Sequence, residues 1–155
     1  MKNNEQQVIT ENSKAIRLAL VFRKTDRIVK AKENRFFRKY EITSMQYCVM
    51  EVLYHRGAMT VQQLIDAVYA TPGNMTAVIH NMERDGFITR ETNPKDRRSF
   101  RITLTDKGEE LITSVLGEHI RLIGEEFSIY SDEEKEVLIR FLEKIVGENE
   151  ESEEK

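Results

Sequence analysis

The stretch from Thr71 to Thr105 gathers the side chains best suited to contact a ligand. Thr71 can cap a helix, and Pro72 suits a first helical position, where its missing N–H is not needed. Apolar residues then follow at helical spacing and predict one buried face: Met75, Val78, Ile79 and Met82. The opposite face has small or hydrogen-bonding residues and no carboxylate: Gly73, Asn74, Thr76, Ala77, His80 and Asn81. Such a face would suit the edges of bases in a major groove.

Two strand-like segments follow this helix, and a basic loop joins them. Residues 87–91 and 99–104 alternate like the strands of a β-ribbon. The loop between them concentrates positive charge around a single acid: Lys95, Asp96, Arg97 and Arg98. A helix followed by a basic ribbon predicts a winged helix-turn-helix, with Lys95 suited to a phosphate contact. The competing interpretation is a solvated hairpin tip.

The run from Asp96 to Gly108, DRRSFRITLTDKG, resembles the wing signature of the MarR family of bacterial transcription regulators. In that signature, D-x-R-S/A is followed by a strand, and L-T-x-x-G then opens a long helix. The resemblance extends over residues 12–146. It implies that Arg98 enters the minor groove and that Asp96 holds the arginines of the wing in place.

The same resemblance identifies residues 71–80 as the recognition helix. Many family members carry a basic residue in this helix where the present chain has Ala77. We therefore expect base readout to depend more on Asn74, on Thr76 and on close backbone approach at Gly73. The base that each residue reads is left open.

The family resemblance also implies a pocket between the helical dimer region and the winged helix-turn-helix, which we call the reading head. In the family, aromatic compounds bind in this pocket and loosen the contact with DNA. Four residues would give such a pocket aromatic and thioether walls: Phe36, Tyr40, Tyr47 and Met50. Packing in the protein core is the alternative role for them. The sequence GNMT-x-VI in residues 73–79 is similar to that of family members that respond to quinones and catechols.

Capping boxes place the other helices of the reading head. Thr43 with Gln46, and Thr60 with Gln63, predict helices over residues 44–55 and 61–68. Together with the helix after Thr71, the second of these helices forms the helix-turn-helix.

Long amphipathic segments flank this reading head. After a frayed polar start, a helix is expected over residues 12–38. Two more helices are expected, over residues 105–127 and 131–147. Their apolar faces would be poorly covered in a single subunit, which predicts a homodimer. We therefore divide the chain into a helical dimerisation region of residues 1–39 and 105–146, a winged helix-turn-helix of residues 40–104, and a disordered acidic tail of residues 147–155.

Charge is unevenly distributed along the chain. The 155 residues include 24 Lys and Arg and 27 Asp and Glu, and the resulting net charge of −3 would by itself argue against nucleic-acid binding. Residues 1–39, however, sum to +7, residues 40–104 to zero and residues 105–155 to −10. We interpret the two ends as complementary, with the basic first helix packed against acidic helices of the same subunit or of its partner. The alternative is that these charges only solvate exposed faces.

The single cysteine, Cys48, shares a helical face with Met45, Val49 and Val52. A buried structural thiol is the expected reading. A redox switch is the alternative, but no basic neighbour is predicted that would lower the pKa of the thiol.

Catalysis and metal binding are not expected. The chain has no nucleophile motif and no glycine-rich phosphate loop, and no cofactor is predicted. Its three histidines, His55, His80 and His119, show no metal-ligand spacing. No apolar run is long enough to cross a bilayer, and no signal-peptide core precedes the first helix, so the protein is expected to be cytoplasmic without a membrane partner.

The sequence thus predicts a mainly α fold with a small β-hairpin wing: a winged helix-turn-helix with N- and C-terminal dimerisation helices. The expected function is that of a dimeric repressor that binds double-stranded DNA at a pseudo-palindromic operator and is released by a small phenolic or quinone-like ligand. The alternative is a winged-helix interaction module whose basic wing binds an acidic protein partner. Sequence-selective binding to duplex DNA would separate the two.

Overall fold

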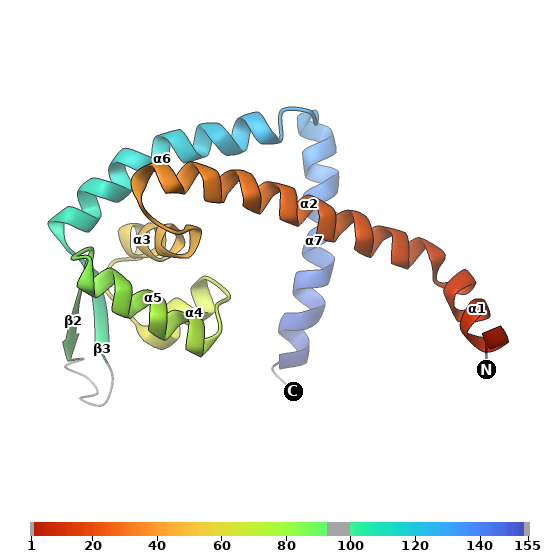
Figure 1. Cartoon of the computed structure of the whole chain (residues 1–155), viewed down its shortest axis with the longest axis horizontal. Helices are drawn as coiled ribbons and strands as arrows, with labels where there is room; N and C mark the ends of the chain where they lie inside the picture. Colours follow the sequence, from red (N-terminus) through yellow and green to blue (C-terminus); the bar gives the residue numbers. More distant parts are fainter. Residues whose placement is uncertain (1, 93–99, 154–155) are drawn as a thin grey trace. The chain divides into compact units, whose positions relative to one another are not determined.

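A computed structural model describes residues 2–92 and 100–153 of the chain (Figure 1). The fold is mainly helical, with one small antiparallel sheet, as the sequence predicted. It divides into two compact units, residues 1–117 and 118–155. In the first unit the elements follow in this order: α1 (Lys2–Glu11), α2 (Ser13–Phe37), η1 (Arg38–Tyr40), α3 (Ser44–Arg56), β1 (Met59–Thr60), α4 (Val61–Ala67), α5 (Pro72–Arg84), β2 (Ile88–Thr92), β3 (Phe100–Leu104) and the first half of α6 (Asp106–Glu126).

The second unit consists of the end of α6 and the helix α7, Asp132–Glu153. A capping box opens α7: the Ser131 backbone N–H donates to Glu134 over 2.9 Å, and the Glu134 N–H donates back to the Ser131 hydroxyl over 3.2 Å. No helix among the described residues is long and apolar enough to cross a membrane.

Both predicted capping boxes of the reading head are present. At the start of α3, the Thr43 N–H donates to Gln46 over 2.8 Å, and the Gln46 N–H returns a bond to the Thr43 hydroxyl. Thr60 and Gln63 repeat this arrangement at the start of α4. Each box satisfies two backbone donors that the first turn of a helix leaves unpaired, which is why the sequence located these starts.

The sheet has the order β1-β3-β2, and both pairings are antiparallel. Figure 1 shows β2 and β3 as the hairpin that the sequence predicted. In this hairpin Ile88 pairs with Leu104 and Thr92 with Phe100. The third strand, β1, was not expected: its two residues pair only where Met59 meets Ile102 and Thr60 meets Arg101.

The core of the first unit lies between the helices and one face of this sheet. The Phe37 and Tyr47 rings stack with their centroids 4.6 Å apart, which fixes the end of α2 against α3. Side chains from seven elements are almost fully buried in this core: Phe37, Tyr47, Val49, Met50, Leu64, Met75, Met82, Ile88, Ile102, Ile112 and Val115.

Two expectations for the chain ends need correction. Residues 2–11, which we expected to be frayed, form α1, and side chains stabilise this helix locally: Gln7 donates to Glu11 over 2.9 Å and Thr10 to the Gln6 carbonyl over 2.8 Å. At the other end, α7 does not stop at Gly147 but continues to Glu153, so the expected disordered tail is largely helical. This segment is rich in glutamate, which is a good helix former.

Candidate nucleic-acid interface

Helix α5 begins as its sequence predicted, and a glycine follows its end. The Thr71 side chain accepts a bond from the Asn74 N–H over 3.4 Å, with Pro72 in the first turn. Gly86 follows the helix with φ +77, a left-handed conformation that favours glycine. The apolar face is buried as expected: Met75, Val78, Ile79 and Met82.

The opposite face of α5 is open to solvent. Five of the predicted contact residues are exposed: Gly73, Asn74, Thr76, Ala77 and His80. The Thr76 hydroxyl donates to the Pro72 carbonyl over 2.9 Å, so its oxygen is left to accept a bond from a ligand. A side chain added at Gly73 would meet nothing within 4 Å, which leaves the backbone open to close approach from outside. This face offers donors and acceptors but no carboxylate.

A junction around Thr105 holds the end of α5 against the start of α6. The Thr105 hydroxyl donates to the Gly86 carbonyl over 2.7 Å and accepts a bond from the Gly108 N–H over 3.1 Å. The Thr105 N–H donates to the Phe87 carbonyl over 3.0 Å. Gly108 lies so close to that same carbonyl oxygen that a Cβ would collide with it. This geometry explains why L-T-x-x-G opens the helix: the threonine caps it, and only glycine fits the approach.

Two arginines brace the base of the wing. The Arg90 guanidinium lies 3.8 Å from the centroid of the Phe100 ring, across the β2–β3 pair. Arg101 donates to the Ala58 carbonyl over 2.9 Å and so connects β3 with the turn that follows α3. Neither contact has a local signal in the sequence, because the first depends on the pairing of β2 with β3 and the second joins residues 43 positions apart.

The predicted wing tip is the one part of the interface that the structure does not describe. Lys95, Asp96, Arg97 and Arg98 lie in residues 93–99, outside the described residues. The strand β2, which precedes them, ends at Thr92, and β3, which follows them, begins at Phe100. The minor-groove role of Arg98 and the supporting role of Asp96 therefore stay predictions.

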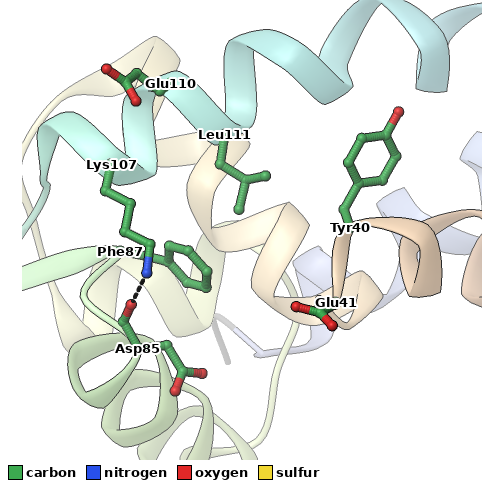
Figure 2. Close-up of a pocket in the computed structure, with 7 residues that line it drawn as sticks. All are labelled: Tyr40, Glu41, Asp85, Phe87, Lys107, Glu110 and Leu111. Carbon is green, nitrogen blue, oxygen red and sulfur yellow. Dashed lines mark hydrogen bonds between the residues drawn. The ribbon is translucent and has the colours of Figure 1, made fainter.

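An open pocket of about 690 Å³ lies beside this interface, between η1, the turn after α5 and the start of α6. Figure 2 shows the side chains that line it: Tyr40, Glu41, Asp85, Phe87, Lys107, Glu110 and Leu111. The Lys107 ammonium donates to the Asp85 backbone carbonyl over 2.7 Å and lies 4.8 Å from the centroid of the Phe87 ring. The bond from the Arg84 guanidinium, 2.9 Å long at its shorter contact, lowers the pKa of the Asp85 carboxyl.

Of the four residues expected to bind a ligand, only Tyr40 lines this pocket. Phe36, Tyr47 and Met50 are at most 7% exposed and pack in the core. The Tyr47 hydroxyl donates to Glu51 over 3.0 Å, and burial together with this carboxylate raises the pKa of Tyr47 above its usual range. The spacing of Lys107, Glu110 and Leu111 could have shown that they share one helical face. Nothing in the sequence places Asp85 or Phe87 opposite them.

Cys48 is half-buried on α3. Burial, reinforced by the negative charges of Glu51 and Glu33, raises the pKa of its thiol to about 11. The thiol is therefore protonated near neutral pH, where only the thiolate reacts readily. This favours the structural role over the redox role. Among the described residues, no group of three or more His, Cys, Asp or Glu side chains is placed to hold a metal ion.

The sequence of this chain is similar to sequences of known proteins over the regions described above. The sequence profile of the MarR family matches residues 42–100. The uncharacterised HTH-type transcriptional regulator YkoM of Bacillus subtilis is 35% identical over 141 residues, which cover 91% of this chain and 89% of that protein.

Solved structures share the fold. A MarR-like transcription regulator from Bacillus cereus matches with a TM-score of 0.77 and 28% identity, over 86% of this chain and 96% of that one. A complex of MepR from S. aureus with DNA matches with a TM-score of 0.77 and 23% identity, over 84% of this chain and 96% of that one. At that identity the second match supports the fold alone.

Proposed function

The chain belongs to the MarR family of winged helix-turn-helix transcription regulators, and we propose that it is a dimeric repressor of a pseudo-palindromic operator from which a small ligand releases it. The observation that carries this proposal is the exposed face of α5, which has no carboxylate from Pro72 to Asn81. The recognition helix of a helix-turn-helix enters the major groove with its N-terminal residues at the base edges. Here those residues include Gly73, Asn74 and Thr76.

The wing would hold the rest of the duplex. The strands β2 and β3 direct the chain toward residues 93–99, whose lysine and two arginines suit phosphates and a narrow minor groove. Among the proteins that share this fold, MepR has been solved with DNA. Repression then requires only that the protein occupies promoter DNA, which agrees with a family of regulators and not of enzymes.

The apolar surfaces of the chain-end helices support a dimer. Large apolar side chains remain exposed along α2, among them Leu18, Val21 and Phe22. On α7 the exposed residues recur at helical spacing: Val137, Leu138, Phe141, Leu142 and Ile145. An exposed apolar stripe of this length is expected to be covered by another protein surface. A two-fold dimer places two recognition helices about one helical turn of DNA apart, roughly 10 bp.

The pocket beside Tyr40 is our candidate for the effector site. The Lys107–Asp85 bond joins two residues that line it and connects α6 to Asp85, the residue that ends α5. A ligand that displaced the Lys107 ammonium would loosen this connection and change the spacing of the two recognition helices. Operator affinity would fall because both helices must fit successive major grooves at once.

The charges around the pocket favour some effectors over others. Three carboxylates and one ammonium line it, so an aromatic carboxylate would be repelled. Neutral phenols and quinones, which fit the resemblance of residues 73–79 to quinone- and catechol-responsive relatives, meet no such penalty. Tyr40, Phe87 and Leu111 supply the apolar walls.

Selection of bound fragments from sheared genomic DNA by the purified protein tests the regulator itself. We expect enrichment of a few promoter fragments that share an inverted repeat. If the folded dimer enriched no fragment with or without candidate effectors, the DNA-binding function would be rejected in favour of an acidic protein partner for the wing.

Titration of the operator complex with catechol and with benzoate at neutral pH tests the effector site. Catechol is expected to weaken operator binding and benzoate to leave it unchanged. Leu111→Trp should fill the pocket and abolish the response to catechol, whereas Leu111→Met should keep it. A full catechol response in Leu111→Trp would place the effector elsewhere.

A further inference from the structure

Tyr69, in the connection between α4 and α5, has an unfavourable backbone conformation. Its φ is +50, a left-handed region that costs free energy for any residue with a Cβ. The Ala70 N–H donates to the Ile65 carbonyl over 3.1 Å, which closes α4 in a Schellman motif with Tyr69 as the left-handed residue. Glycine is the usual residue at this position. Elsewhere among the described residues, Gly57 and Gly86 take positive φ, and Glu41 is the one other residue with a Cβ that does so.

Packing within the protein does little to stabilise Tyr69 in this conformation. The Tyr69 side chain is 81% exposed, more than any other large apolar or aromatic side chain among the described residues. A strained residue persists when surrounding contacts or function require it, and strain of this kind gathers at functional sites. With the ring outside the core, a contact with another molecule is the better explanation.

The location of Tyr69 points to DNA. Tyr69 precedes Thr71, the N-cap of α5, by two residues, in the connection that joins α4 and α5 in Figure 1. It also borders an open hollow of about 410 Å³ together with Arg56, whose guanidinium would attract a phosphate. Asp66, the one carboxylate on that hollow, accepts a bond from Gln62 over 2.8 Å. When a recognition helix enters the major groove, the residues just before it lie near the phosphates that border the groove.

We propose that Tyr69 binds the DNA backbone beside the major groove, with its hydroxyl donating to a phosphate oxygen. The contact is independent of base sequence and fixes the register of α5 on the duplex. Because tyrosine is uncharged, it releases no counterion on binding. Its contribution should therefore not change the salt dependence of affinity.

Three variants test this proposal against the operator duplex recovered by genomic selection and against a random duplex of equal length. Tyr69→Phe removes only the hydroxyl and should weaken binding to both duplexes at least about tenfold, the effect of one hydrogen bond to a charged acceptor. The slope of log affinity against log salt should be that of the wild type. Tyr69→Gly should weaken binding more strongly and yet unfold at an equal or higher temperature, because the strain is relieved. Tyr54→Phe, which removes an exposed hydroxyl from α3, is the matched control and should bind as the wild type does.

The proposal rests on the DNA-binding function, and the experiment separates the two. If the wild-type protein bound no duplex, the proposed function itself would fail. If the wild type bound but both Tyr69 variants matched it, only the present inference would be overturned. A lower unfolding temperature for Tyr69→Gly would show that the ring packs within the fold. A change in the dimer dissociation constant, measured by sedimentation, would assign the ring to a second copy of the chain.

Discussion

At the scale of single residues, the close approach of α6 to the Phe87 carbonyl makes Gly108 irreplaceable, whereas Gly117 in the same helix has open space around it. Gly108→Ala is expected to destabilise the protein by about 1–3 kcal/mol, the usual cost of overpacking against a rigid neighbour. Gly117→Ala is the matched control, and it should stabilise the helix by up to about 1 kcal/mol. Urea unfolding of the two variants measures both effects. Equal stabilities would mean that the junction at Thr105 is looser than its hydrogen bonds indicate.

Cys48 should resist oxidation for the same local reasons that raise its pKa. Alkylation by iodoacetamide at pH 7.5 is expected to be at least about tenfold slower than for a free cysteine, because little thiolate is present. The rate should rise as the pH approaches 11. Operator binding should survive mild peroxide treatment. Rapid alkylation at neutral pH together with peroxide-sensitive binding would restore the redox switch.

The raised pKa of Cys48 also makes the stability of the folded protein depend on pH. Folding raises the pKa of Cys48 from 9.0 to about 11, so the folded state holds this proton more tightly than the unfolded state. The resulting stability is fully present below pH 9 and is lost as the pH rises toward 11. Unfolding followed by circular dichroism over this range should show the decline, and Cys48→Ser should reduce it.

At the scale of elements, the wing carries its own prediction. Arg98→Ala is expected to weaken operator binding and to reduce the steepness of log affinity against log salt by about two, because each subunit of the dimer loses one cationic contact with DNA. The unfolding temperature should not change, because the resemblance to the wing of the family implies that Arg98 is exposed. Undiminished binding by this variant at moderate salt would remove Arg98 from the mechanism.

The elements that the sequence predicted are those encoded by neighbouring residues. Thr43 with Gln46, and Thr60 with Gln63, form their bonds across three residues, so the helix starts could be read directly. The strand β1 could not, because two residues carry no period and this strand exists only through its pairing with β3.

The candidate effector site shows the same limit. The aromatic residues Phe36 and Tyr47 looked like pocket walls because residue type does not tell a buried ring from a pocket wall, and the structure buries both. The pocket that does form joins three segments, represented by Tyr40, Asp85 and Lys107, whose proximity depends on the tertiary fold. Tyr69 was missed because a left-handed conformation at a tyrosine leaves no mark in the sequence.

At the scale of the whole molecule, the apolar stripe on α7 predicts that the protein must form a dimer to bind its operator tightly. Phe141, 54% exposed, lies within that stripe. Phe141→Asp should shift the protein from dimer to monomer in sedimentation velocity and weaken operator binding at least about tenfold, because a monomer occupies one half-site only. Phe141→Leu should remain dimeric. A dimeric Phe141→Asp protein with wild-type affinity would move the interface elsewhere.

The strand order of the sheet also determines when the strands of the reading head can pair during synthesis. Because β3 lies between β1 and β2, the strand before α4 acquires its partner only when residues 100–104 arrive, after both helices of the reading head. During synthesis, therefore, α4 and α5 emerge from the ribosome before β3, which pairs with the strand before α4 and with the strand after α5. Pairings between distant segments form late and slowly. A nascent chain that stalls at the wing would carry a complete recognition helix on an unclosed scaffold, a natural substrate for chaperones and proteases.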